Sequence, residues 1–148
     1  MAAYLSTELG QTANQTSAPV GYKPRATVYG GRLKRLRGTF TLNTQTTSDT
    51  LVVGNLPAGA TFAFGMLTSS VSLSTSTVAV GISGSTGKYR AAATFTATDT
   101  PTPFGTAATV GAADPALSAE EQVFVTIATA SLPASGTFIV DLYYSAPN

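Results

Sequence analysis

The stretch from residue 51 to 95 limits the fold of this chain more than any other. It reads LVVGNLPAGATFAFGMLTSSVSLSTSTVAVGISGSTGKYRAAATF, and apolar side chains recur at every second position, first at Phe62, Phe64 and Met66 and then at Val78, Val80 and Ile82. Alternation of this kind gives a β-strand one apolar face and one wetter face. The intervening NLPAG, SLSTS and GISGSTGK are rich in turn-forming residues. We predict a β-meander without helices, in which GISGSTGK is a flexible loop between strands.

The flanking segments continue the same pattern. In residues 32–42 the apolar Leu36, Phe40 and Leu42 share one face, and Arg35 and Arg37 share the other. Towards the C-terminus two further alternating runs are present, at Val123, Val125 and Ile127 and at Phe138, Val140, Leu142 and Tyr144. Between them, residues 96–118 contain three prolines and predict a long exposed loop with a short extended piece near 107–110. We expect about seven to nine strands.

Short strands, frequent turns and the lack of helical periodicity indicate an all-β fold. The prediction is a single antiparallel β-sandwich of jelly-roll type over residues 32–148. Residues 1–31 differ, because their apolar side chains follow no period and several Pro and Gly residues interrupt any regular element. We therefore expect an extended N-terminal arm, which lies either on a partner or on its own domain.

The composition points to a protein that associates with neighbours. Charged residues make up 10% of the 148 residues, against roughly 25% in ordinary soluble domains. Because surface charge keeps proteins apart in solution, a charge-poor surface favours association. The chain has no membrane-length apolar run and no signal-peptide pattern at its N-terminus, so we predict no membrane partner and synthesis in a cytoplasm.

The sequence offers little that supports catalysis or cofactor binding. It contains no His and no Cys, which removes the commonest general base, metal ligands and thiol nucleophile. Its carboxylates fall mainly in predicted turns, and we expect Asp141, in the last strand, to face outward. The segment from Gly81 to Tyr89 lacks the spacing of a phosphate-binding loop and the helix that must follow it. We predict a protein that is not an enzyme and binds no cofactor or metal.

One charged feature of the sequence indicates a binding partner. Six of the eight basic residues lie within residues 23–37, a segment without any acid, and are Lys23, Arg25, Arg32, Lys34, Arg35 and Arg37. This basic cluster would suit an acidic protein surface, because arginines form bidentate pairs with carboxylates. It would also suit a strand edge protected by charge against mispairing. Nucleic acid binding is the least favoured reading, since net charge is only +1.

Several segments together resemble a family of small virion proteins from tailed bacteriophages. They are GRLKRLRGTFTL, LVVGNLPAGATF, TVAVGISGSTGKYRAAATF and VFVTIATASLPASGTFIVDLYYS. The resemblance lies in the LPAGA turn, the GKY turn and the closing LPASG hairpin, and it covers roughly residues 32–146. It implies a head component of the capsid decoration, or cement, class, located on the capsid surface of the virion.

The same resemblance implies a major capsid protein as partner, self-association as a homotrimer, and no active site. Partner-binding residues are then expected in the arm, at Tyr4 and Leu5, and in the basic cluster. Two alternatives stay open. The chain could be another virion structural protein, from the tail, a fibre or the head-to-tail connector. It could also be a carbohydrate-binding sandwich, for which the outward Tyr143 is the available aromatic.

Overall fold

The computed structural model describes residues 32–106, 109 and 116–146. Eight strands form there, which agrees with the expected number: β1 (Leu33–Thr41), β2 (Thr50–Leu56), β3 (Thr61–Ser69), β4 (Thr77–Ile82), β5 (Ser85–Thr94), β6 (Thr102–Phe104), β7 (Glu121–Ala128) and β8 (Thr137–Ser145). The predicted arm, with Tyr4, Leu5, Lys23 and Arg25, lies outside the described residues, as does most of the extended piece expected near 107–110.

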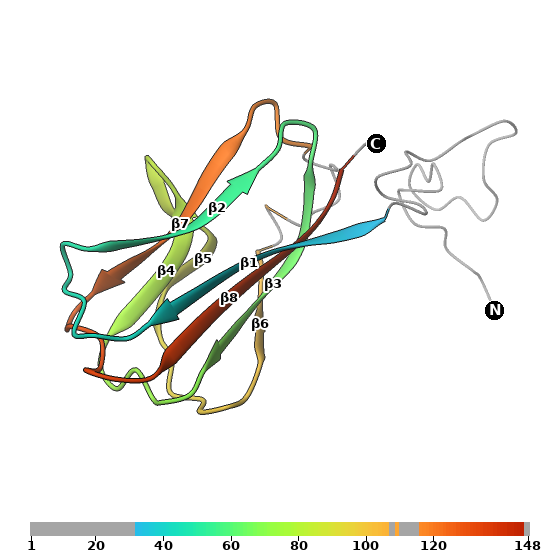
Figure 1. The fold of residues 1–148 in the computed structure, drawn as a ribbon. Helices are drawn as coiled ribbons and strands as arrows, with labels where there is room; N and C mark the ends of the chain where they lie inside the picture. The colour runs from blue at the N-terminus through green and yellow to red at the C-terminus, as the bar shows by residue number, and fades with distance from the viewer. Residues whose placement is uncertain (1–31, 107–108, 110–115, 147–148) are drawn as a thin grey trace, which may run out of the picture.

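The strands form two antiparallel sheets of four, in the orders β1-β8-β3-β6 and β2-β7-β4-β5 (Figure 1). The pairings are nested along the chain, because the first strand pairs with the last, the second with the seventh, the third with the sixth and the fourth with the fifth. A long hairpin of four strand pairs, folded into two facing sheets, is the topology of a jelly roll. The predicted all-β sandwich is therefore confirmed.

The predicted meander is wrong. Consecutive strands β2, β3 and β4 alternate between the two sheets, and only β4 and β5 form a local hairpin. GISGSTGK is also more ordered than expected, since β4 ends at Ile82 and β5 begins at Ser85. Gly84 has a φ of 79° in the tight turn that joins them, a conformation that glycine adopts without steric cost. The segment expected as a flexible loop thus consists of the end of β4, a two-residue turn and the start of β5.

The predicted long loop after β5 contains the short edge strand β6, which pairs with β3. Pro103 lies in the middle of β6. A proline cannot donate a backbone hydrogen bond, so it is tolerated here because β6 has a neighbour on one side only. Because β6 has only three residues and no alternation of apolar side chains, the sequence pattern does not predict it as a strand.

The core lies between the two sheets and is built mainly from the alternating positions. Phe138, Val140 and Leu142 of β8 are fully buried and face Val123 and Val125 of β7 in the other sheet. Aromatic contacts cross between the layers as well. Phe95 packs edge-on against Phe138 with ring centroids 6.4 Å apart, a favourable arrangement for two aromatic rings.

The alternation in β3 is broken at one point. The pairing with β8 shifts between Phe62 and Phe64, which marks a β-bulge. As a result Phe62 is 3% exposed in the core while Phe64 is 38% exposed on the outer surface. The sequence pattern placed Phe62, Phe64 and Met66 on one face. This prediction is wrong for Phe64 and Met66, because the bulge reverses the face of the side chains that follow it.

Candidate functional site

The outer face of the β1-β8-β3-β6 sheet carries the described features that suit a binding surface. Register pairs Arg35 of β1 with Tyr143 of β8, and Tyr143 with Phe64 of β3, so the three side chains form one row across the sheet. The rings of Phe64 and Tyr143 are stacked, with centroids 4.6 Å apart and planes 18° from parallel. Arg35 is exposed at the end of this row. We call these three residues the outer row.

The next row of the same face holds an ion pair. Arg37 lies opposite Asp141 and donates from Nε and Nη2 to the two carboxylate oxygens, at 2.7 and 2.6 Å. This hydrogen bonding, with the negative charge of Asp141, raises the pKa of Arg37 above its usual value. Asp141 faces outward as predicted, yet it is only 5% exposed because its neighbours cover it.

The structure places the described part of the basic cluster on β1 and the residue before it. β1 is an edge strand, and Arg32, Lys34 and Arg35 are all exposed. Arg37 differs, since it already has an intramolecular carboxylate partner. A charged edge is what protection against strand mispairing requires. Among the described residues the cluster therefore offers Arg32, Lys34 and Arg35 as exposed cations outside an ion pair, whereas Arg37, although also exposed, is paired with Asp141.

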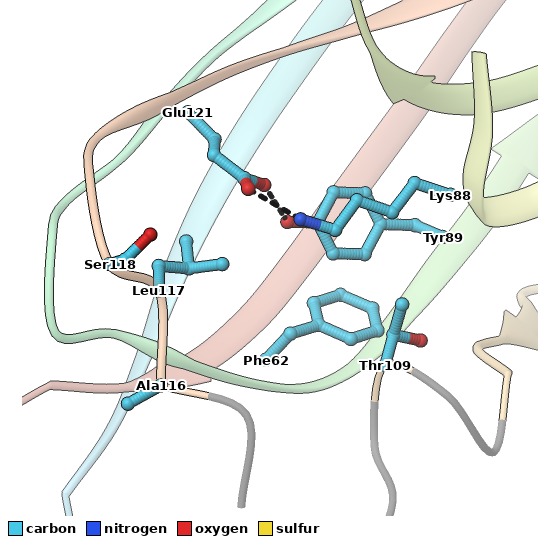
Figure 2. A pocket seen from close by; sticks show the side chains of 8 residues that line it. All are labelled: Phe62, Lys88, Tyr89, Thr109, Ala116, Leu117, Ser118 and Glu121. Carbon is cyan, nitrogen blue, oxygen red and sulfur yellow. Dashed lines mark hydrogen bonds and ion pairs between the residues drawn. The ribbon is translucent and has the colours of Figure 1, made fainter. Parts of the chain in front are cut away.

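A second feature is a pocket of about 190 Å³ at the start of β7, lined by residues from both sheets (Figure 2). Phe62 and Leu117 supply apolar walls, while Lys88, Tyr89 and Glu121 supply the polar side. Leu117 is held in place by backbone hydrogen bonds to Gly59 and Ala60, at 2.7 and 2.8 Å. The contacts of Phe62 and Tyr89, whose ring centroids are 4.6 Å apart, join the two sheets at this end.

Glu121 is the centre of the polar side of the pocket. Its carboxylate accepts hydrogen bonds from the Lys88 amine and from the Tyr89 hydroxyl, the latter at 2.7 Å, and Figure 2 shows both donors turned towards it. β5 and β7 are not neighbours in their sheet, so these bonds tie the edge strand to β7 across the end of β4. Because the donors and the acceptor satisfy one another, we interpret the cluster as a structural clamp.

The hydrogen bond of Tyr89 in this clamp can be tested by measuring the stability of the fold at alkaline pH. Burial, with the hydrogen bond to Glu121 and its negative charge, raises the pKa of Tyr89 well above the usual tyrosine value of about 10. Above pH 10 the unfolded chain ionises this tyrosine while the folded chain keeps it neutral, so stability is lost as the pH rises. The slope from this one group approaches about 1.4 kcal/mol per pH unit.

We expect Tyr89→Phe to unfold more easily than the wild type at pH 7, because it lacks the hydroxyl, and to show a shallower loss of stability between pH 10 and 11.5. Urea unfolding at a series of pH values measures both effects. The other tyrosines and lysines are common to the two proteins and cancel in the comparison. Equal slopes above pH 10 would show that Tyr89 is not protected as described.

Sequence reasoning found some parts of these features and missed others. The outward direction of Arg35, Arg37 and Tyr143 follows from alternation, but Phe64 joins them only through the bulge. Neither Glu121 nor Lys88 was predicted as a site residue, because the two positions lie 33 residues apart in the chain and no local pattern brings them together. Within the part of the chain that the structure describes, no three acidic side chains gather into a metal site. That part also contains no helix with the length and apolarity needed to cross a bilayer.

Solved structures provide the comparison that bears on function. Over 93% of its length, this chain matches 97% of a chain in the capsid asymmetric unit of cyanophage Pam1, with a TM-score of 0.65 and 26% identity. The chain is similar to a bacteriophage capsid protein. The likeness supports a virion structural protein, and therefore a location in a virus particle.

Two further matches agree in fold. A chain from the capsid of Ralstonia phage GP4 has a TM-score of 0.62 and 20% identity, with 80% of this chain and 86% of that chain covered. One from the acid-stable capsid of Helicobacter pylori bacteriophage KHP30 has a TM-score of 0.58 and 14% identity, with coverage of 78% and 89%. No family model matches the sequence, and no curated protein matches it either.

Proposed function

We propose that this protein is a capsid decoration protein, which binds the assembled shell of a bacteriophage head and stabilises it. The observation that carries the proposal is the near end-to-end match to a chain of a phage capsid. A match over 93% of this chain and 97% of the other supports a counterpart in a capsid for the jelly roll as a unit and not for a fragment of it. The family that the LPAGA and LPASG turns resemble supports the same role.

The physical basis of stabilisation would be mass action. A protein that binds the assembled shell, and not its separated subunits, shifts the equilibrium towards the shell by an amount that grows with its concentration and affinity. A charge-poor surface suits this task, because little charge must be desolvated when it is covered. We propose the major capsid protein as the partner, non-enzymatic action, and self-association as a trimer.

The predicted contact residues become part of this proposal. The proposed contacts with the shell are the arm, with Tyr4, Leu5, Lys23 and Arg25, and the exposed Arg32, Lys34 and Arg35. Arg37, which is exposed on the same face as Arg35 and paired with Asp141, would lie beside them. Removing residues 1–31 is expected to lower the affinity for shells at least tenfold, since the arm and two of the cluster's cations are lost. Sedimentation of the truncated protein with shells measures this, and unchanged affinity would exclude the arm from the contact.

Copy number in purified virions tests the proposal as a whole. Quantitative mass spectrometry of this chain against the major capsid protein is expected to give hundreds of copies per particle. A count of a dozen or fewer would overturn decoration and favour the alternative role in a tail, fibre or head-to-tail connector. Particles that lack this chain should also lose their DNA at a lower temperature than complete particles.

A further inference from the structure

We propose that the outer row, Arg35, Tyr143 and Phe64, is the centre of the surface that docks on the shell, and that the docked surface of the shell protein presents carboxylates beside an apolar side chain. This inference rests on the proposed function and specifies which face of the jelly roll carries it. It differs from a role for the whole basic cluster, because two of the three residues are aromatic and lie on β8 and β3.

The first argument is the placement of apolar groups outside the core. Phe64 is 38% exposed although it lies in the interior of β3. It does not stand alone, since Tyr143 stacks on it and register places Met66 and Ile139 on the same face. A rigid aromatic pair with an adjacent arginine is the composition typical of residues that dominate binding energy in protein interfaces.

The second argument is that a bulge creates the surface. Without the bulge between Phe62 and Phe64, regular alternation would point the ring of Phe64 into the core together with that of Phe62. Bulges commonly redirect a side chain at a functional position. Here the bulge moves a large aromatic ring from the core side to the outer side of a central strand. It also interrupts the regular pairing of β3 with β8.

The charge of this face indicates which kind of protein surface could dock on it. The acid on this face, Asp141, is already paired with Arg37, so the face keeps the positive charge of Arg35. A second copy docked through the same face would bring like charges together. It would also offer few carboxylates in return, because Asp49, Glu120, Glu121 and Asp141 already accept hydrogen bonds within their own chain. An acidic and partly apolar surface on another protein is the better complement.

Three charge-introducing variants test the inference. Arg35→Glu and Phe64→Glu alter the outer row, while Val52→Glu changes a side chain that is 51% exposed on β2 of the opposite sheet and serves as the control. Each purified protein is sedimented with shells assembled without this chain. We expect the affinities of Arg35→Glu and Phe64→Glu to fall at least tenfold and that of Val52→Glu to stay within twofold of the wild type. Urea unfolding checks that each variant is folded. If Phe64→Glu does not fold, Arg35→Glu still tests the inference, because the Arg35 side chain is exposed.

The outcomes separate the inference from the proposed function. If the wild type binds shells and Arg35→Glu binds equally well, the decoration role stands and the outer row is excluded from docking. If the wild type does not bind shells, both are overturned. If the outer-row variants bind shells normally but change from oligomer to monomer in solution, the face mediates self-association and the inference fails. The wild type should also lose affinity at high salt more steeply than Arg35→Glu, because screening weakens a charged contact.

Discussion

Phe138→Ala is expected to lower the free energy of unfolding by about 3–5 kcal/mol, the range typical of removing a fully buried aromatic ring. Phe138 is 0% exposed and contacts Phe95 across the core. It lies on β8, which has β1 on one side and β3 on the other, so neither neighbour can move inward without breaking strand pairing. The cavity therefore stays open, and the variant shows the full loss in the free energy of unfolding.

Urea unfolding of Phe138→Ala beside Phe64→Ala measures this effect against a matched control. Phe64 is a phenylalanine of the same sheet that is partly exposed, and its truncation removes chiefly the stacking with Tyr143. We expect the control, Phe64→Ala, to lower the free energy of unfolding by about 1 kcal/mol. Similar losses for the two variants would contradict the assignment of Phe138 to the core and of Phe64 to the surface.

Gly81→Ala is expected to destabilise the fold by about 3 kcal/mol, at the upper end of what overpacking usually costs. A Cβ atom at position 81 would overlap the backbone carbonyl groups of Ser85 and Thr86. Backbone cannot rotate away as a side chain can, so the β4–β5 turn would have to shift as a whole. Gly81 also pairs with Phe124 of β7, which fixes it from the other side.

Gly87→Ala provides the control for this prediction. Its added Cβ would lie 3.3 Å from the Cα of Ala91, a tight contact that a small adjustment relieves. Because alanine loses less conformational entropy on folding than glycine does, the two effects offset each other and the change should stay within about 1 kcal/mol. A Gly81→Ala protein with wild-type stability would show that the hairpin is less tightly closed than described.

The candidate surface has the same physical origin as the main error made from the sequence. Alternation predicted that Phe62, Phe64 and Met66 share a face, and a regular strand would have obeyed it. The bulge in β3 breaks the rule at the point where the outer row forms. A bulge leaves no reliable mark in a single sequence, because it depends on the register with β8, whose residues lie about 80 positions further along.

The sequence alone determined most of the strands and, outside the bulge in β3, most of their faces. Alternation is a local property, since each residue's face follows from its neighbours in the chain, and it correctly predicted the inward side of β1, β7 and β8. It also supported the sandwich, because many short strands with one apolar face must be covered by a second layer.

Only the tertiary structure decided which strands pair. The nested pairings of β1 with β8 and β2 with β7 join residues far apart in the chain, and no local pattern records them, which is why a meander was expected instead. The burial of Asp141 beside Arg37 and the contact of Glu121 with Lys88 and Tyr89 depend on those pairings. Charged and aromatic side chains that are far apart in the sequence form an ion pair, a clamp and the proposed docking surface because distant strands bring them into register.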